Sequence, residues 1–242
     1  MEKKKVKRIR PRWFAIIKGL LKIFIRKPKF IYLGDEIKER SLILSNHVGA
    51  KGPLAWELYF KSPFRFWGTY EMNSSLPKVY VYLSKIYFHQ KKHWPLWLSR
   101  ILCVIAAPLL WVFYRGLNLI STYPDYRFRN TVKISVEEIE NNRSIVVFPE
   151  DSSNGYHDKL TMFFAGFLVF AKKCYKKGYD LPIYVAYLKK KTKEMIIDKP
   201  VLYSELANLE LSQQEIADKL CDRMNELAAL NFEKCEEKWK KH

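Results

Sequence analysis

Residues 41–54, SLILSNHVGAKGPL, determine the fold that we predict for this chain. Four residues with strand character, Leu42–Ser45, lead directly into Asn46 and His47, and a glycine-containing turn with Pro53 follows. This order predicts a strand, a polar turn and then a helix with Pro53 near its first position, where the missing proline N–H costs little. Open α/β sheets usually place their chemistry at the carboxyl ends of strands. His47 is therefore a candidate functional residue, and a histidine that only caps a loop is the alternative.

A second polar loop follows a second apolar strand. Residues 144–148, SIVVF, lack polar alternation, as expected for a strand buried on both faces of a largely parallel sheet. The loop after them carries Glu150, Asp151 and Ser152. Loops that follow parallel strands meet at one edge of the sheet, so these side chains are expected near His47.

Strand-like and helix-like segments alternate along the rest of the chain. The expected strands are residues 30–33, 41–45, 64–69, 116–120, 144–148 and 182–188, and the expected helices are residues 13–25, 53–60, 127–141, 163–177 and 212–230. Ser212 and Glu215 have the spacing of a capping box that opens the last helix. The alternation predicts an α/β fold with a central, mainly parallel β-sheet flanked by helices.

The positive charge of the chain is concentrated at its start. The length of 242 residues suits one substantial domain and an appendage, and the net charge is +18. Residues 1–29 hold twelve lysines and arginines against one glutamate. Such a local concentration favours a cationic segment over a nucleic-acid-binding surface. The four cysteines share no C-x-x-C spacing, which favours a reduced, intracellular setting without disulfides or structural zinc.

We expect residues 1–29 to be a basic amphipathic membrane-associating segment and residues 30–242 to be the α/β domain. In residues 13–25, WFAIIKGLLKIFI, Lys18 and Lys22 lie on one helical face and large apolar side chains on the other, as is typical of a helix in a membrane interface. The alternative is a terminal helix packed on the domain with its lysines in water. Each basic residue near an anionic leaflet adds about 1 kcal/mol of attraction, so we expect a peripheral protein at the cytoplasmic face of a membrane.

Residues 94–114 are the most apolar part of the chain. Their uninterrupted run, residues 101–114, is shorter than the roughly 20 residues that span a bilayer, and Pro108 divides it. We expect a buried helix or a helix that dips into one leaflet.

A cationic turn precedes this apolar stretch. His89 and His93 are four residues apart, which can hold a metal from one helix face, but Lys91 and Lys92 lie between them and no acidic ligand accompanies them. We therefore expect these residues to be surface residues and predict no metal site.

Taken in order, these motifs resemble the glycerolipid acyltransferase family, whose members acylate glycerol 3-phosphate and lysophosphatidic acid. Asn46-His47 resembles the start of the family's N-H-x4-D block, and residues 116–120 resemble the start of its G-x-x-x-I-x-R block. Residues 147–150 resemble the start of F-P-E-G-T-R, and Ala165-Gly166 resembles the small-residue step that follows it. Residues 181–186 resemble the V-P-I-x-P-V block.

The resemblance implies a fold, a reaction and a setting. In a standard member the histidine, here His47, removes a proton from the acceptor hydroxyl as it attacks the thioester of acyl-CoA or acyl carrier protein, and the aspartate orients the imidazole. The arginines and the glutamate's loop hold the phosphate of the acceptor. The resemblance thus implies phospholipid biosynthesis at a membrane, with membrane lipids and the acyl donor as partners, no nucleic acid, and no cofactor beyond the donor.

This chain departs from the family at the aspartate and at both arginines. Gly52 stands at the aspartate, Thr122 at the arginine of the second block, and Asp151, Ser152 and Ser153 at Gly-Thr-Arg. An acyltransferase with a different acceptor and a non-catalytic lipid-binding relative of the same fold both remain open.

Other side chains are candidates for the missing roles. Glu57, one helical turn beyond Pro53, is the candidate orienting carboxylate, with a solvated helix residue as the alternative. Arg127 and Arg129 are candidates for phosphate binding, with an ordinary surface position as the alternative. We expect a carboxylate, from Glu57 or from the loop with Glu150, within hydrogen-bond reach of the imidazole.

Overall fold

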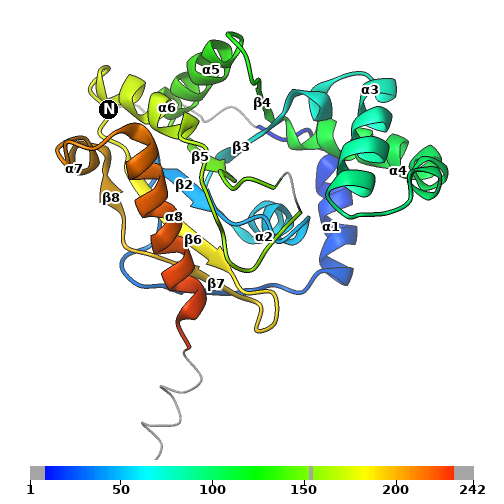
Figure 1. The fold of residues 1–242 in the computed structure, drawn as a ribbon, viewed down its shortest axis with the longest axis horizontal. Helices are drawn as coiled ribbons and strands as arrows, with labels where there is room; N and C mark the ends of the chain where they lie inside the picture. The colour runs from blue at the N-terminus through cyan, green and yellow to red at the C-terminus, as the bar shows by residue number, and fades with distance from the viewer. Residues whose placement is uncertain (1–8, 153–154, 232–242) are drawn as a thin grey trace, which may run out of the picture.

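A twisted β-sheet forms the centre of the protein (Figure 1). The computed structural model describes residues 9–152 and 155–231. Within them the sheet has eight strands in the order β1-β7-β6-β2-β5-β3-β4, with β8 paired to β6. The strands are β1 (Lys29–Tyr32), β2 (Leu42–Ser45), β3 (Phe64–Thr69), β4 (Ile120–Thr122), β5 (Ser144–Val147), β6 (Pro182–Leu188), β7 (Glu194–Ile197) and β8 (Val201–Leu202).

Helices fill most of the connections between strands. They are α1 (Phe14–Phe24), α2 (Lys51–Tyr59), the 3₁₀ helix η1 (Tyr70–Asn73), α3 (Leu76–Val81), the π-helix η2 (Tyr82–Gln90), α4 (Leu96–Leu117), α5 (Phe128–Glu140), α6 (Gly166–Tyr175), α7 (Tyr203–Ala207) and α8 (Gln213–Ala229).

The sheet is mainly parallel. Strands β6, β2, β5, β3 and β4 pair in parallel, whereas β7 and β8 pair antiparallel to β6. Strand β1 is parallel to β7 at the edge. The predicted α/β fold with a mainly parallel sheet flanked by helices is confirmed, and the antiparallel β6–β7 hairpin is an addition that we did not predict.

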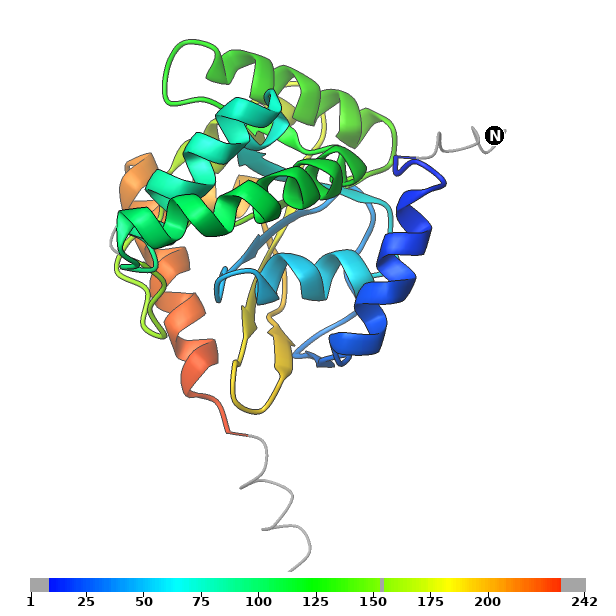
Figure 2. The ribbon, with the colours of Figure 1, turned by 90° about the vertical axis from the view of Figure 1, so that its right-hand side faces the viewer.

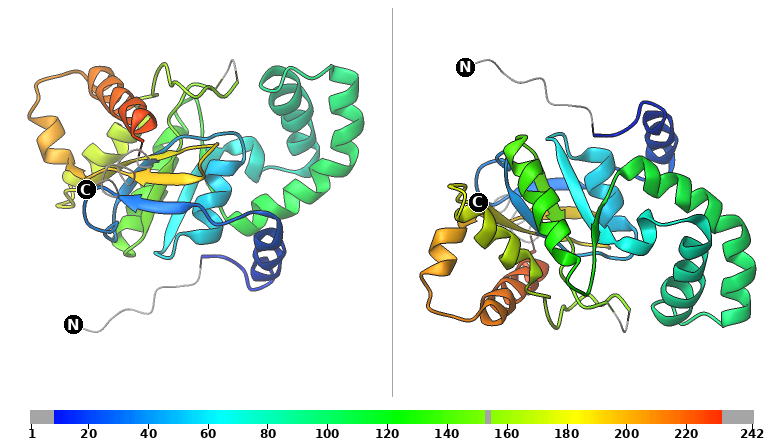
Figure 3. Two further views of the ribbon diagram at one scale, coloured as in Figure 1. Left: turned by 90° about the horizontal axis from the view of Figure 1, so that it is seen from below. Right: turned by 90° about the horizontal axis from the view of Figure 1, so that it is seen from above.

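Two helical layers cover the two faces of the sheet (Figure 3). Leu42 and Leu44 of β2 pack into a core with α5, α6 and α8, whereas Ile43 between them packs into a second core with α1 and α2. Successive side chains of a strand point to opposite faces, so an apolar run without alternation is what a sheet covered on both faces requires. The capping box of Ser212 and Glu215 is present at the start of α8.

A helical lobe formed by α3, η2 and α4 stands beside the sheet (Figure 3). It has a small core of its own, which includes Leu83 and Cys103. Helix α4 continues through Pro108, and much of its apolar surface is exposed, so the predicted buried helix is wrong. By length and composition α4 is apolar enough to cross a membrane, and it alone meets that test among the described residues.

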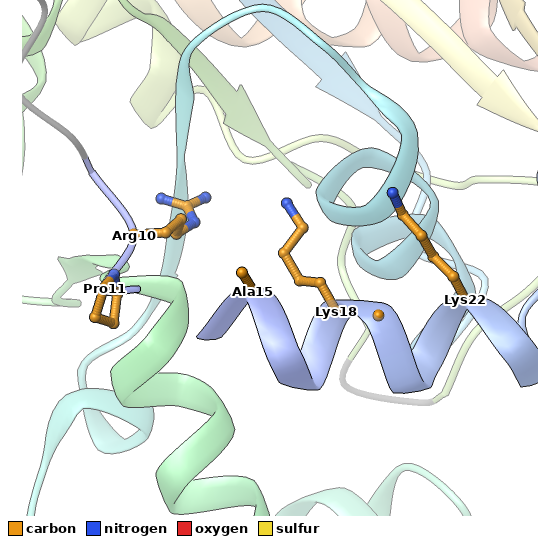
Figure 4. Close-up of a pocket in the computed structure, with 6 residues that line it drawn as sticks. Arg10, Pro11, Ala15, Lys18 and Lys22 are labelled. Atoms are coloured by element: carbon orange, nitrogen blue, oxygen red, sulfur yellow. The ribbon is translucent and has the colours of Figure 1, made fainter. Parts of the chain in front are cut away.

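Helix α1 packs on the same side of the molecule as α4 (Figures 1 and 2). Phe14 is fully buried, and a β-carbon on Gly116 at the end of α4 would lie 2.0 Å from its ring. The basic side chains Arg10, Lys18 and Lys22 extend together toward α2 (Figure 4). The alternative in which α1 packs on the domain with its lysines in water is confirmed for the packing, through Phe14, and for the exposed Lys22, but it is wrong for Lys18, which is turned inward.

The element boundaries differ from prediction in two places that matter below. Helix α2 begins at Lys51, two residues before Pro53. Residues 116–120 do not form a strand, because α4 continues to Leu117 and ends at Asn118 in a left-handed conformation that terminates helices. Strand β4 then runs from Ile120 to Thr122. Cys103, Cys174 and Cys221 are buried free thiols, whereas Cys235, Ser153 and the basic residues 1–8 lie outside the described residues.

Candidate active site

The end of β2 is fixed by two side chains before the functional loop begins. The Asn46 amide donates to the carbonyl of Leu188 (3.1 Å) and accepts from the Leu188 N–H (2.7 Å), which ties β2 to the end of β6. The Trp56 indole N–H donates to the Ser45 hydroxyl at 2.9 Å, which ties β2 to α2. Both contacts are buried, so His47 starts from a rigid position.

The turn after His47 has an unusual backbone. Val48 has φ +44° and Gly49 has φ +64°, and positive φ is costly for a β-branched residue such as valine. The Gly52 N–H donates to the His47 carbonyl at 2.9 Å and closes the turn. A β-carbon on Gly52 would lie 2.4 Å from the Asn46 carbonyl oxygen and 2.6 Å from that of His47. The family's aspartate is thus excluded from this position by the backbone.

A backbone carbonyl holds the His47 imidazole. Its Nδ1 lies 2.6 Å from the Gly49 carbonyl oxygen, and the ring packs against Phe148 (4.6 Å between centroids) and Tyr156 (5.1 Å). Burial lowers the pKa of His47 to about 4, and the charges of Lys91 and Lys92 act in the same direction. The ring is therefore neutral at pH 7. Because a carbonyl only accepts hydrogen bonds, Nδ1 carries the proton and Nε2 is the free base.

The expected carboxylate at the imidazole is not there. In the described part of the chain no carboxylate bonds to the ring, and Glu150 reaches His47 at its main chain instead: Glu150 Oε1 accepts from the His47 N–H at 2.9 Å. Glu150 is only 8% exposed, and burial raises its pKa to about 7 despite this bond and the charge of Lys91. The predicted convergence of the two loops is confirmed, but the contact differs from the one we expected.

Glu57 belongs to another part of the structure. It is 2% exposed, and its carboxylate accepts from Arg10 Nη2 at 2.7 Å and Lys18 Nζ at 3.0 Å. Neither expectation for Glu57 is correct: it does not orient His47, and it is not a solvated helix residue. It joins α2 to α1 through a buried group of three charges.

The two candidate arginines also lie away from His47. Arg127 forms an exposed ion pair with Asp125 (2.7 Å) and stacks on the Tyr123 ring, and Arg129 stacks on Tyr126. These contacts place both arginines at the start of α5, where neither touches the His47 loop. Of the predicted substrate-binding residues, Glu150 contacts His47, and Asp151 and Ser152 lie beside Lys91 at the edge of the site, whereas the two arginines lie outside it.

Sequence reasoning missed two lysines and a tyrosine at this site. The Lys91 ammonium donates to the Ser152 hydroxyl at 2.6 Å, and the ammonium groups of Lys91 and Lys92 lie 5.7 and 5.4 Å from the Tyr156 ring centre. A signal was present in Gly155: its φ is +104°, and a β-carbon there would lie 3.2 Å from the Lys91 carbonyl oxygen. A glycine needed for close approach marks a loop that another segment contacts.

The assembled groups suit proton transfer. They are an unprotonated imidazole nitrogen, a carboxyl group that titrates near neutrality and two ammonium groups. In residues 9–152 and 155–231 no group of three histidine, cysteine, aspartate or glutamate side chains is arranged to hold a metal ion.

Comparisons with known proteins give a likeness in structure. No protein-family model matches the sequence, and no curated protein matches it. Among solved structures, the chain is similar to the 1-acyl-sn-glycerophosphate (LPA) acyltransferase PlsC from Thermotoga maritima, with a TM-score of 0.49 and 15% sequence identity. The similarity covers 91% of this chain and 80% of that chain.

Proposed function

We propose that this protein is a peripheral membrane acyltransferase, acting at the cytoplasmic face, that moves a fatty acyl group from acyl-CoA or acyl carrier protein to a lysophospholipid, glycerol phosphate or related alcohol. His47 is the general base. The observation that carries the proposal is the neutral imidazole, whose Nδ1–H is held by the Gly49 carbonyl while Nε2 remains free to accept a proton.

The proposed reaction needs only these groups and the two substrates. Nε2 of His47 takes the proton of the acceptor hydroxyl as its oxygen attacks the thioester carbonyl carbon. The C–S bond then breaks, and the departing thiolate receives the proton from the imidazolium. The Gly49 carbonyl fixes the tautomer as the family's aspartate does, but as a neutral acceptor it stabilises the imidazolium less. The low pKa of His47 makes a weak base, so we expect slow turnover.

The position of the motifs in the fold supports this proposal. Asn46-His47 follows β2 and Pro149-Glu150 follows β5, and these two strands are neighbours in the sheet. The block at residues 181–186 lies in β6, the other neighbour of β2. Segments far apart in the sequence therefore meet in the arrangement that a shared active site requires.

The exposed apolar surface supports the membrane setting. On α1, Ile23 and Phe24 are 73% and 81% exposed. Ile16 and Leu20 of α1 are exposed as well, and α4 exposes large apolar side chains of its own: Trp97, Ile101, Val104, Ile105 and Leu109. Exposed apolar side chains gathered on one helix mark a lipid or protein interaction site. Lys18 and Arg10 point into the domain, which leaves the apolar face of α1 outward.

The catalytic proposal is tested by His47→Ala, assayed with acyl-CoA and acyl carrier protein donors and a panel of phosphorylated and neutral acceptors. General-base contributions are about 10²- to 10⁴-fold, so we expect at least a 10²-fold loss with an unchanged circular dichroism spectrum. His157→Ala, an exposed histidine of the loop after β5, is the control and should retain full activity. Transfer that persists in His47→Ala would remove this histidine from the mechanism.

A non-catalytic lipid-binding relative is the second candidate. Two observations favour it: the backbone excludes an aspartate at Gly52, and among the described residues no carboxylate bonds to the imidazole. Wild-type protein that binds acyl-CoA or lysophospholipid but transfers no acyl group to any acceptor would decide for this candidate.

The membrane proposal is tested without truncation, because deleting residues 1–29 would also remove the buried Phe14. Ile23→Ser/Phe24→Ser should lower binding to phosphatidylglycerol vesicles at least tenfold, since burial of each side chain contributes about 1.5–3 kcal/mol. Ile134→Ser/Val169→Ser, which alters exposed apolar residues on α5 and α6, is the matched control. Equal binding by both double variants would show that another surface binds the vesicles.

A further inference from the structure

The turn between η2 and α4 brings two lysines to the edge of the His47 site. Lys91 and Lys92 both lie over the Tyr156 ring, whose other neighbour is the His47 imidazole. A β-carbon on Gly49, the residue whose carbonyl holds His47, would lie 3.5 Å from the Lys92 ammonium. The two ammonium groups therefore lie beside the same tyrosine ring as the proposed base.

The backbone of this turn is ordered by its own hydrogen bonds. The Lys91 N–H donates to the Ile86 carbonyl (2.9 Å), and the Trp94 N–H donates to the Phe88 carbonyl (3.0 Å). On the other side, Gly155 allows the loop after β5 to approach the Lys91 carbonyl closely. The backbone of the turn is thus held between two packed segments, with the Lys91 side chain half-buried and the Lys92 side chain exposed beside it.

The charges of Lys91 and Lys92 are unevenly neutralised. Lys91 is partly buried, and burial lowers the pKa of its ammonium, although Glu150 and Asp151 oppose this shift. The Lys91 ammonium donates to a neutral hydroxyl, that of Ser152. In the part of the chain that the structure describes, no carboxylate forms an ion pair with Lys92. Two ammonium groups and a hydroxyl donor are suited to an anion, and of the two only Lys91 is acted on by the carboxylates Glu150 and Asp151.

The resemblance implies phosphate-binding arginines at Thr122 and Ser153, and Ser153 lies outside the described residues. The Thr122 hydroxyl donates to the Gly68 carbonyl at 3.1 Å, and the candidate replacement Arg127 is paired with Asp125. We propose that Lys91, Lys92 and the Ser152 hydroxyl form a relocated anion site that holds the phosphate monoester of the acceptor beside His47. This inference rests on the proposed acyl transfer for its placement, but it makes its own claim about binding.

Lysine and phosphate chemistry fit this assignment. A phosphate monoester carries close to two negative charges at neutral pH, and charge-assisted hydrogen bonds to it are short and strong. The two lysines come from the turn between η2 and α4, and the serine comes from the loop after β5. A bound phosphate would therefore contact both the helical lobe and the sheet domain. The site then selects phosphorylated acceptors over neutral ones.

The first experiment measures binding alone. Titration calorimetry compares glycerol 3-phosphate binding to wild-type protein and to Lys91→Gln/Lys92→Gln. We expect the double variant to bind at least about tenfold more weakly, since hydrogen bonds to charged groups contribute about 1.5–3 kcal/mol each. Lys172→Gln/Lys173→Gln removes an adjacent exposed pair from α6 and should bind as the wild type does. Failure of the wild type to bind at millimolar concentrations, or equal binding by both variants, would overturn the inference.

The second experiment measures selectivity in turnover. With lysophosphatidic acid as acceptor, Lys91→Gln/Lys92→Gln should raise the acceptor KM at least about tenfold, whereas the KM for monoacylglycerol should change less than about threefold. A rise in the KM for acyl-CoA instead would assign the lysines to the donor phosphates and overturn the inference. If glycerol 3-phosphate binding depends on the two lysines but the protein transfers no acyl group, the anion site is supported and the proposed function is rejected.

Discussion

Glu57 and Glu150 are two buried carboxylates that were both candidates for the His47 site, and their surroundings give them different roles. Glu57 is matched by two cations, Arg10 and Lys18, which bring the N-terminal segment onto α2. Glu150 accepts a main-chain N–H from His47, and its burial raises its pKa to about 7. A carboxylate fully matched by cations stabilises the fold, whereas one that is only partly matched remains able to titrate. Proximity to His47 along the sequence is therefore a poor guide to catalytic involvement.

The strongest test adds a third carboxylate, at the family's aspartate position. Gly52→Asp should destabilise the protein by more than about 3 kcal/mol and reduce acyl transfer to background, because its β-carbon would overlap two carbonyl oxygens. Gly19→Asp, where nothing lies within 4 Å of the added β-carbon, is the control for a glycine-to-aspartate change in a helix. Urea unfolding and turnover measure both effects. Increased activity in Gly52→Asp would contradict the steric argument.

Glu57→Gln separates a structural carboxylate from a catalytic one. It leaves Arg10 and Lys18 without their anion, and breaking a buried ion pair costs about 3–5 kcal/mol. Both cations retain some exposure, so we expect a loss of about 3 kcal/mol in urea unfolding. Turnover per folded molecule should stay within about twofold of wild type. The exposed Glu39→Gln is the control, and a selective loss of turnover in Glu57→Gln would return this residue to the active site.

Glu150→Gln tests the titrating carboxylate, and its effect depends on pH. The native Glu150 pKa, about 7, is above its ordinary value of 4.5, so the native state holds the proton more tightly and stability falls as pH rises from about 4.5 to 7. His47 acts oppositely: its lowered pKa makes stability rise between about 4 and 6.5. Glu150→Gln removes only the first contribution. The glutamine amide oxygen accepts the His47 N–H less strongly than a carboxylate does, which costs about 1 kcal/mol. With this cost included, the variant should be about 2 kcal/mol more stable than wild type at pH 8 and about equally stable at pH 4.

Urea unfolding at pH 4, 6 and 8 measures this difference. Glu39→Gln, an exposed glutamate, should show no such trend. A Glu150→Gln variant no more stable than wild type at pH 8 would mean that the carboxylate is better solvated than the structure shows.

The sequence predicted those parts of the fold that depend on local pattern. Strands β3 and β6 have the predicted bounds, 64–69 and 182–188, because apolar runs between turn residues define them. Strand β7 was missed, since EMII is a short segment with nothing to distinguish it beforehand. The end of α4 was missed because its left-handed cap, Asn118, follows Gly116, which our pattern assigned to a strand.

Only the site residues that directly follow a strand could be predicted from the sequence. His47 and Glu150 follow adjacent parallel strands, and their meeting was expected from sheet geometry alone. The lysines could not be placed, because their position depends on how the helical lobe packs beside the sheet. Glu57 was misassigned because its partner Arg10 lies 47 residues earlier, a separation that no local pattern reveals.

The burial of Phe14 against Gly116 has a consequence for the order in which the protein is made. These two residues are 102 positions apart (116 − 14), and the Asn118 amide bonds to the Ile9 carbonyl across 109 positions. At about 5–20 residues per second, translation leaves α1 without its docking surface for roughly 5–20 s. During that interval its apolar face and its lysines are both uncovered. A nascent chain made beside a membrane therefore meets the lipid surface with α1 before α1 meets the rest of its own domain.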